Sequence, residues 1–219
     1  MNAILEPLLR SPRFPRYVEE LTATLRDEEA ARSRFRASLR DDVRAEFING
    51  EVVTHMSTRQ LHTDTVRRLL MLLSAYVQVN RLGLVNAEHS LTAFTRNDYL
   101  PDICFWGGDK AEAISQQQLI YPVPDFICEV LSPTTARNDR GVKFEDYAAH
   151  GVGEYWIADP VTRAIEQHLL HDGAYVLKAN CSEGDVTSAA IRGLVMPVAA
   201  AFDDEANLAA LWKLAPQSR

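Results

Sequence analysis

The stretch PDFICEVLSPTTARNDRGVKFEDYAAHGVGEYWIADP, residues 124–160, places one acidic residue inside an apolar run. Glu129 stands within FICEVL, residues 126–131, and the run is bounded by polar residues and prolines. Such a run predicts a buried strand. A carboxylate buried there is costly unless a cation or hydrogen-bond donors pair with it. Glu129 therefore predicts a partner elsewhere in the chain.

Length and composition are those of an ordinary globular protein. The chain has 219 residues, of which 47% are hydrophobic and 24% charged, which suits one domain with a well-filled core. No apolar stretch approaches the roughly 20 residues that span a bilayer, and the N-terminus has no secretory-signal pattern. Three widely spaced cysteines, Cys104, Cys128 and Cys181, predict reduced thiols and a cytoplasmic location.

The charge is acidic and unevenly distributed. The net charge is −7, which argues against a protein that coats nucleic acid non-specifically. Residues 1–44 hold nine arginines and eight acids, whereas the remainder holds 14 basic and 22 acidic residues. An acidic site that binds metal ions would share this sign, so the balance does not exclude a nuclease.

The first half of the chain predicts two helices and a hairpin. Residues 15–40 are rich in Glu, Ala, Arg and Leu but have a weak apolar face, which predicts a helical appendage that packs on the core or on a partner. Asn49-Gly50 between alternating segments predicts a hairpin over 43–54. Apolar residues at helical spacing predict a helix over 59–80, with Ser57 or Thr58 as N-cap and Gly83 as its stop.

The second half predicts strands around one further helix. Short strand-like runs precede residue 131, a helix is expected over 138–149, and strands follow, with a hairpin turn at Asp172-Gly173. Tyr155 and Trp156 are expected to pack in the core. This order predicts an α+β or mixed α/β fold with a central mixed sheet flanked by helices.

Two acids and a lysine stand out from these apolar elements. Asp102 follows Pro101 and opens a second apolar strand, 27 residues before Glu129. If the two strands pair, the carboxylates meet and repel unless a cation lies between them; oxygen ligands suit Mg²⁺ or Mn²⁺. Lys143 lies on the next helix. Taken singly, Asp102 is most simply a turn residue, Glu129 a satisfied buried acid and Lys143 a surface lysine, so only the combination is informative.

The same residues resemble a known family. Pro101-Asp102, CEVLSP at 128–133, Asp139, Lys143, Tyr147 and GVGEYWIADP at 151–160 resemble the Uma family of putative restriction endonucleases, as do the hairpin EFINGEV and His62. The resemblance covers residues 43–180. It implies a restriction-endonuclease-like core of the PD-(D/E)xK superfamily over 43–219, with residues 1–42 as an N-terminal helical extension.

The resemblance also implies roles for individual residues. Asp102 and Glu129 would be the two motif acids and hold Mg²⁺ or Mn²⁺. The superfamily's lysine normally stands two residues after the second acid, where this chain has Leu131, so Lys143 would replace it. Glu46 or Glu51 would complete the acidic cluster, and His62 would assist proton transfer. The implied activity is a metal-dependent endonuclease that hydrolyses nucleic acid, with DNA as the expected substrate.

Two other functions remain open. A nucleic-acid or protein interaction module could keep this fold without cleaving. A hydrolase with two carboxylates, such as a glycosidase, would need neither the lysine nor a metal. The helix over 15–40 is a candidate for self-association into a homodimer.

Overall fold

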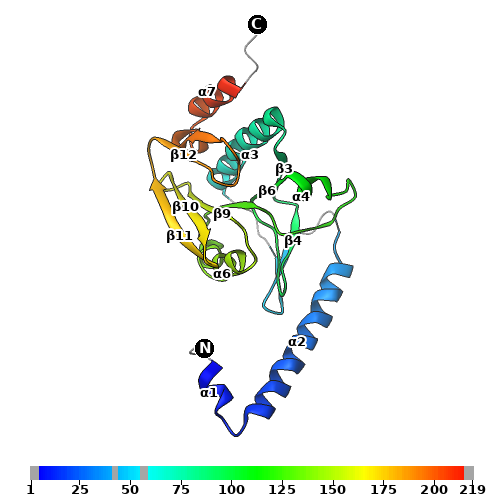
Figure 1. Cartoon of the computed structure of the whole chain (residues 1–219). Coiled ribbons are helices and arrows are strands. Elements are labelled where there is room, and N and C mark those ends of the chain that lie inside the picture. The colour runs from blue at the N-terminus through cyan, green and yellow to red at the C-terminus, as the bar shows by residue number, and fades with distance from the viewer. Residues whose placement is uncertain (1–4, 41–43, 55–58, 215–219) are drawn as a thin grey trace. The chain divides into compact units, whose positions relative to one another are not determined.

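The computed structural model describes residues 5–40, 44–54 and 59–214. Its contacts divide the chain into two compact units. Unit 1 comprises Met1–His55 and Thr95–Asp98, and unit 2 comprises Met56–Phe94 and Tyr99–Arg219. Figure 1 labels the elements of both.

Unit 1 consists of two helices and a hairpin: α1 (Leu5–Leu9), α2 (Phe14–Ala37), β1 (Ala45–Ile48) and β2 (Glu51–Thr54), and its boundary falls within β5 (Asp98–Tyr99). β1 and β2 pair antiparallel, with Ile48 opposite Glu51. The turn residues Asn49 and Gly50 both have positive φ, 51° and 88°, as a type I′ turn requires. The predicted hairpin and the predicted first helix are therefore confirmed.

Asp98 anchors α2 within unit 1. Arg32 donates to both carboxylate oxygens of Asp98, at 2.9 and 2.6 Å, and Arg36 does the same. Burial alone would raise the pKa of Asp98, but the hydrogen bonds from the two arginines lower it below its ordinary value. Phe35 stacks on Phe47 of β1 at 5.9 Å between ring centroids. Among the described residues of α2 only Arg32 and Phe35 are buried, which confirms the weak apolar face.

Unit 2 contains the remaining elements, namely α3 (Gln60–Asn80), β3 (Gly83–Ala87), β4 (Leu91–Ala93), β6 (Ile103–Gly107), α4 (Gly108–Glu112), β7 (Ile120–Tyr121), β8 (Phe126–Val130), α5 (Ala136–Asp139), α6 (Val142–Ala149), β9 (Glu154–Asp159), β10 (Ala164–His171), β11 (Ala174–Cys181), β12 (Asp185–Thr187), β13 (Val195–Pro197), the 3₁₀ helix η1 (Val198–Ala201) and α7 (Asp204–Leu214).

A six-stranded sheet in the order β11-β10-β9-β8-β6-β3 forms the centre of unit 2. Its β8–β9 pair is parallel and its other pairs are antiparallel, so the expected mixed central sheet is confirmed. β4 pairs instead with β7, in parallel, and β12 pairs with β13. The sequence pattern gave no sign that these short strands would lie outside the central sheet.

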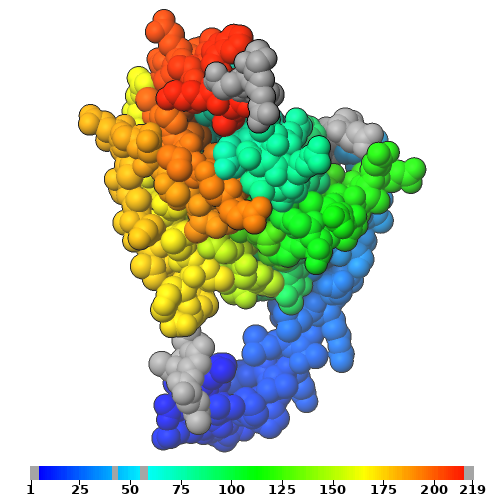
Figure 2. All heavy atoms as spheres, turned by 45° about the horizontal axis from the view of Figure 1, so that its top comes forward, coloured from blue at the N-terminus to red at the C-terminus, as the bar shows by residue number. Residues whose placement is uncertain are grey.

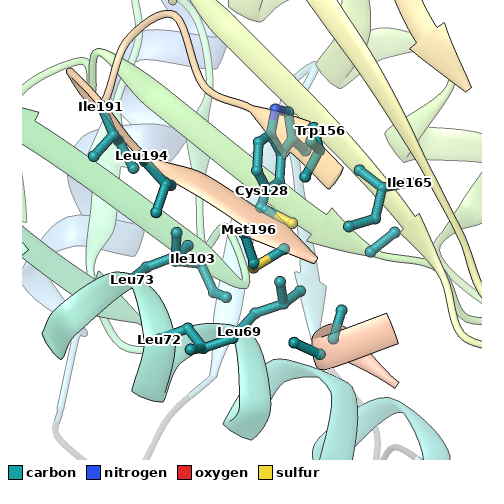
Figure 3. Close-up of a cluster of buried hydrophobic side chains, with 14 of the residues drawn as sticks. Leu69, Leu72, Leu73, Ile103, Cys128, Trp156, Ile165, Ile191, Leu194 and Met196 are labelled. Carbon is teal, nitrogen blue, oxygen red and sulfur yellow. The ribbon is translucent and has the colours of Figure 1, made fainter. Parts of the chain in front are cut away.

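Alternation along β8 sends its side chains to two different environments. Cys128 and Val130 belong to a buried apolar cluster with Leu69 and Leu73 of α3. Because successive residues of a strand point to opposite faces, Glu129 points away from that cluster. Figure 3 shows the cluster, with α3 residues meeting Ile103, Cys128, Trp156 and Ile165 of the sheet. Tyr155 and Trp156 are fully buried, as predicted.

The C-terminal segment completes the apolar core. Leu194 and Met196 lie in the same cluster as the α3 leucines (Figure 3). In Figure 2 the orange-to-red segment that includes β13 and α7 lies against α3. The Asn207 side chain donates to the carbonyls of Arg68 and Ala200, at 3.0 and 2.8 Å. These bonds fix α7 to α3 and η1.

The range of α3 agrees with the predicted 59–80, but the residues that cap the helix differ from the prediction. Ser57 and Thr58 lie outside the described residues, and Arg59 occupies the N-cap position with no side-chain cap. Gly83 is not the stop: the helix ends at Asn80, and Arg81 adopts the left-handed conformation at φ 53°. Gly83 instead begins β3, where an added Cβ would lie 2.0 Å from the Trp106 carbonyl oxygen.

The helix expected over 138–149 is divided into α5 and α6. Gly141 separates them, and an added Cβ there would lie 2.7 Å from the Arg137 carbonyl oxygen. The Arg137 carbonyl thus leaves no room for a side chain at position 141, which explains the glycine. The predicted common face survives the break, since Lys143 Nζ still lies 3.4 Å from Asp139 Oδ1.

Glu154 is a second buried acid, and it is satisfied without a basic residue among its hydrogen-bond donors. Its Oε1 accepts from the Trp156 indole and the Gln167 amide, both at 2.6 Å. Its Oε2 accepts from the Ser188 hydroxyl at 2.6 Å and from the backbone N–H groups of Ala189 and Ala190 at 2.9 and 2.8 Å. The carboxylate therefore holds the 188–190 turn against the sheet.

Glu154→Gln should destabilise unit 2 by about 2–4 kcal/mol, because the new amide NH₂ would face donors where an acceptor stood. Urea denaturation followed by tryptophan fluorescence measures this. Glu166→Gln is the matched control: its partner Arg140 is partly exposed, so its loss should stay below about 1 kcal/mol. Equal losses in the two variants would contradict a buried structural role for Glu154.

Candidate active site

The pairing of β6 with β8 brings Asp102 and Glu129 together. Ile103 lies opposite Cys128 in the antiparallel register, so the residues just before and just after them are neighbours. The Asp102 N–H donates to Glu129 Oε2 at 3.1 Å, and the Val130 N–H donates to Asp102 Oδ2 at 2.8 Å. The proximity expected from the sequence is thus present, and backbone groups fix both carboxylates.

Lys143 and Tyr147 of α6 are partners of Glu129. Lys143 Nζ donates to Glu129 Oε1 at 3.0 Å, and the Tyr147 hydroxyl donates to the same oxygen at 2.9 Å. The Glu129 and Lys143 side chains are only 3% and 2% exposed. This ion pair offsets part of the free-energy cost of removing the Glu129 carboxylate from water.

Asp139 lies on the other side of the same lysine. Its Oδ1 is 3.4 Å from Lys143 Nζ, and both side chains are buried. The Tyr155 hydroxyl donates to the Asp139 carbonyl at 3.0 Å. Lys143 is therefore placed between two carboxylates, which favours its charged form.

A second group of donor atoms surrounds Asp102. One ligand atom each from His62, Glu88 and Asp102 lies within 4.8 Å of the other two. His62 Nε2 is 3.2 Å from Asp102 Oδ2. The Glu88 N–H donates to the Asp102 carbonyl at 3.2 Å. Among the residues that the structure describes, these three form the set that could hold a metal ion.

Sequence reasoning missed Glu88. It follows the last residue of β3 and has a positive φ of 54°, which is uncommon outside glycine. The sequence signal was an acid at the end of the run GLVNAE, residues 83–88. That signal is weak, because acids at strand ends are usually turn residues.

The electrostatics at His62 favour a positive charge. Burial opposes its protonation, but the hydrogen bond with Asp102 and the carboxylates of Asp102, Glu88 and Asp139 outweigh burial and raise the pKa of His62. His62 Nδ1 is buried and has no hydrogen-bond partner among the described residues. A field that attracts a proton at this point also attracts a metal ion.

The cluster has an outer and an inner part. The Asp102 side chain is 17% exposed and Glu88 is partly exposed, whereas Glu129, Lys143 and Asp139 are buried. A ligand from solvent would thus reach the His62–Glu88–Asp102 set, hereafter the outer triad, before the Glu129–Lys143 pair, hereafter the inner pair.

The other two predicted acids belong to unit 1. Glu46 is buried on β1, and Glu51 is exposed on β2. The register pairs Glu46 with Val53 and Glu51 with Ile48, which places both acids on one face of the hairpin. Their participation in the site stays a prediction.

The fold places unit 2 in a structural class. The chain is similar to the crystal structure of a protein titled a putative nuclease belonging to DUF820 from Anabaena variabilis, with a TM-score of 0.66 and 15% identity. The match covers 81% of this chain and 96% of that chain. At this identity the likeness shows the fold alone, which is restriction-endonuclease-like, as predicted.

The family follows from the sequence comparison. The Uma2 family model, described as "Putative restriction endonuclease", matches residues 32–199. The chain therefore belongs to the Uma2 family, and family and fold together support a nuclease. A comparison with curated proteins gave no match. The matched range begins at Arg32, one of the two residues that anchor α2 to Asp98.

Without metal, Glu129→Gln and Lys143→Met should each destabilise the protein by about 3–5 kcal/mol. The first leaves the buried lysine with Asp139 as a remaining carboxylate partner, and the second leaves the buried Glu129 carboxylate without the lysine cation. The double variant should lose clearly less than the sum, with a coupling of roughly 1–3 kcal/mol. Denaturation in EDTA measures the cycle. The partly exposed Arg140–Glu166 pair is the control and should couple by under about 1 kcal/mol. Additive losses at the inner pair would exclude a direct Glu129–Lys143 interaction.

Proposed function

We propose that this protein is a divalent-metal-dependent endonuclease that hydrolyses DNA. The observation that carries the proposal is the outer triad beside a buried acid–lysine pair, in a chain of the Uma2 family. Phosphodiester hydrolysis requires charge neutralisation on the phosphoryl oxygens and an activated water.

We also propose a cytoplasmic location for the protein. Its three cysteines are unpaired, as is usual for proteins of that compartment.

The donor set fits a divalent ion. One imidazole nitrogen and two carboxylates meet in a partly exposed position. Mg²⁺ prefers oxygen ligands, whereas Mn²⁺ and neighbouring ions also accept imidazole. We therefore assign the ion to His62, Glu88 and Asp102, with Mn²⁺ as a better fit than Mg²⁺. Glu129 remains the alternative ligand beside Asp102. A bound divalent ion would polarise the phosphate and lower the pKa of a water.

Asp102, Glu129 and Lys143 have different proposed roles beside the metal ion. Asp102 is fixed by the Val130 N–H at 2.8 Å, so its carboxylate has a defined direction. Glu129 is held by Lys143, Tyr147 and the Asp102 N–H. In this arrangement Glu129 Oε2 lies beside Asp102 and can accept a proton from a water that enters there. Lys143 is thus a positioning residue that acts through Glu129.

Measurement of metal binding distinguishes a metal ion at His62, Glu88 and Asp102 from one between Asp102 and Glu129. Titration with Mn²⁺ by calorimetry should show that His62→Gln, Glu88→Gln and Asp102→Asn each weaken binding by roughly 10- to 100-fold or more, since ligand loss should cost at least as much as loss of a supporting partner. Glu145→Gln, an exposed acid on α6, is the charge-matched control and should bind as the wild type does. If Glu129→Gln abolishes binding while Glu88→Gln leaves it intact, the metal lies between Asp102 and Glu129.

Cleavage tests the function itself. Plasmid and linear duplex DNA should be cut with Mn²⁺ and left intact in EDTA, and single-stranded DNA and RNA define the substrate range. Asp102→Asn and Lys143→Met should each reduce the rate by at least about 100-fold, the usual effect of removing one electrostatic group from a site. Wild type that binds Mn²⁺ and DNA without cutting would instead support a non-cleaving interaction module.

A further inference from the structure

The N-terminal half of α2 carries an apolar stripe that continues the face by which α2 packs in unit 1. Phe14, Val18, Leu21 and Leu25 follow the alternating four- and three-residue spacing of a coiled-coil seam. The same spacing continues through Arg32 and Phe35, which are buried within unit 1. The C-terminal half of this helix face, with Arg32 and Phe35, is therefore packed within unit 1, whereas the N-terminal half, from Phe14 to Leu25, has no buried residue.

Three of the four side chains of this stripe are exposed, and Phe14 is partly buried. Val18, Leu21 and Leu25 are 42%, 58% and 56% exposed. Isolated exposed apolar residues are ordinary, but a row on one helix face marks a contact surface. The positions that flank the row include Thr22 and Thr24, which are uncharged and therefore do not oppose close approach of a second helix. The stripe also lies before residue 32, outside the range matched by the family.

The charges on this segment favour an antiparallel partner of the same sequence. The N-terminal end of α2 carries Arg13 at the N-cap and Arg16 in the first turn and has no acid before Glu19, whereas residues 19–29 carry five acids and one arginine. Two copies aligned antiparallel place the basic end of one helix beside the acidic part of the other. The helix dipoles favour the same orientation. Parallel copies would place like charges together.

We propose that α2 mediates homodimerisation through an antiparallel, two-fold symmetric pairing of Val18, Leu21 and Leu25 with a second copy of this chain. Leu21 lies at the two-fold axis opposite its own counterpart, and Val18 of each copy packs against Leu25 of the other. Such an isologous contact closes on itself, so assembly stops at the dimer. The pairing is independent of the proposed catalytic chemistry.

Sedimentation velocity of the full chain over a concentration series tests the pairing. The wild type should form a dimer, and Leu21→Glu should shift the population to monomer, since two buried glutamates would then meet at the axis. Ala23→Glu adds the same charge on the opposite, exposed face of the same helix and should dimerise as the wild type does. Circular dichroism shows whether each variant keeps its helix content. A wild type that stays monomeric at every concentration, or a Leu21→Glu variant that still dimerises, would overturn the proposal.

Thiol crosslinking tests the orientation. In a Cys181→Ser background, where the remaining Cys104 and Cys128 are buried, Val18→Cys and Leu25→Cys chains are mixed and treated with a short bismaleimide. Antiparallel pairing should link Val18→Cys chains to Leu25→Cys chains. Crosslinks only between identical variants would show a parallel pairing and reject the antiparallel arrangement.

Discussion

The ion pair between Glu129 and Lys143 is the constraint on which the architecture of unit 2 depends. Alternation along β8 directs Cys128 and Val130 into the apolar core and sends Glu129 to the opposite face. A buried carboxylate needs a cation or hydrogen-bond donors, and here Lys143 supplies the cation at 3.0 Å. For Lys143 to reach Glu129, α6 must begin close to β8. At the junction between α5 and α6, the Arg137 carbonyl leaves no room for a side chain at position 141, where the chain has glycine. The positions of Gly141 and Lys143 relative to Glu129 are thus linked to the pairing of this one buried carboxylate.

The two buried acids of the sheet illustrate two solutions to the same problem. Glu154 is satisfied by five neutral donors and holds a turn. Glu129 is paired with a charged lysine and linked through a backbone N–H to Asp102. The second arrangement keeps charge close to a partly exposed carboxylate, where it can act on a ligand. Buried charge alone therefore does not identify a catalytic residue; its connection to the outer triad distinguishes Glu129 from Glu154.

Much of this arrangement could be predicted because it depends on short-range patterns. Asn49-Gly50 predicted the hairpin, and apolar runs predicted the strands. The combination of an acid in an apolar strand and a lysine on the next helix singled out Glu129 and Lys143, although the resemblance assigned Glu129 to a metal ion and not to the lysine. The role of each residue in catalysis remains a prediction. Glu88 was missed because its place beside Asp102 depends on its positive φ and on the hydrogen bond from its N–H to the Asp102 carbonyl. Neither feature has a sequence signal. The end of α3 at Asn80 agrees with the predicted range, but its capping residue was missed because Arg81, not a glycine, adopts the left-handed conformation.

We propose that a divalent ion binds at His62, Glu88 and Asp102 while the Glu129–Lys143 pair stays intact behind it. Anomalous diffraction from crystals soaked in Mn²⁺ tests this most directly, because the signal locates the ion without any knowledge of the substrate. We expect one anomalous peak within bonding distance of the three side chains, with Lys143 still hydrogen-bonded to Glu129. A peak between Asp102 and Glu129 with the lysine displaced, or no peak in a Mn²⁺-soaked crystal, would contradict it.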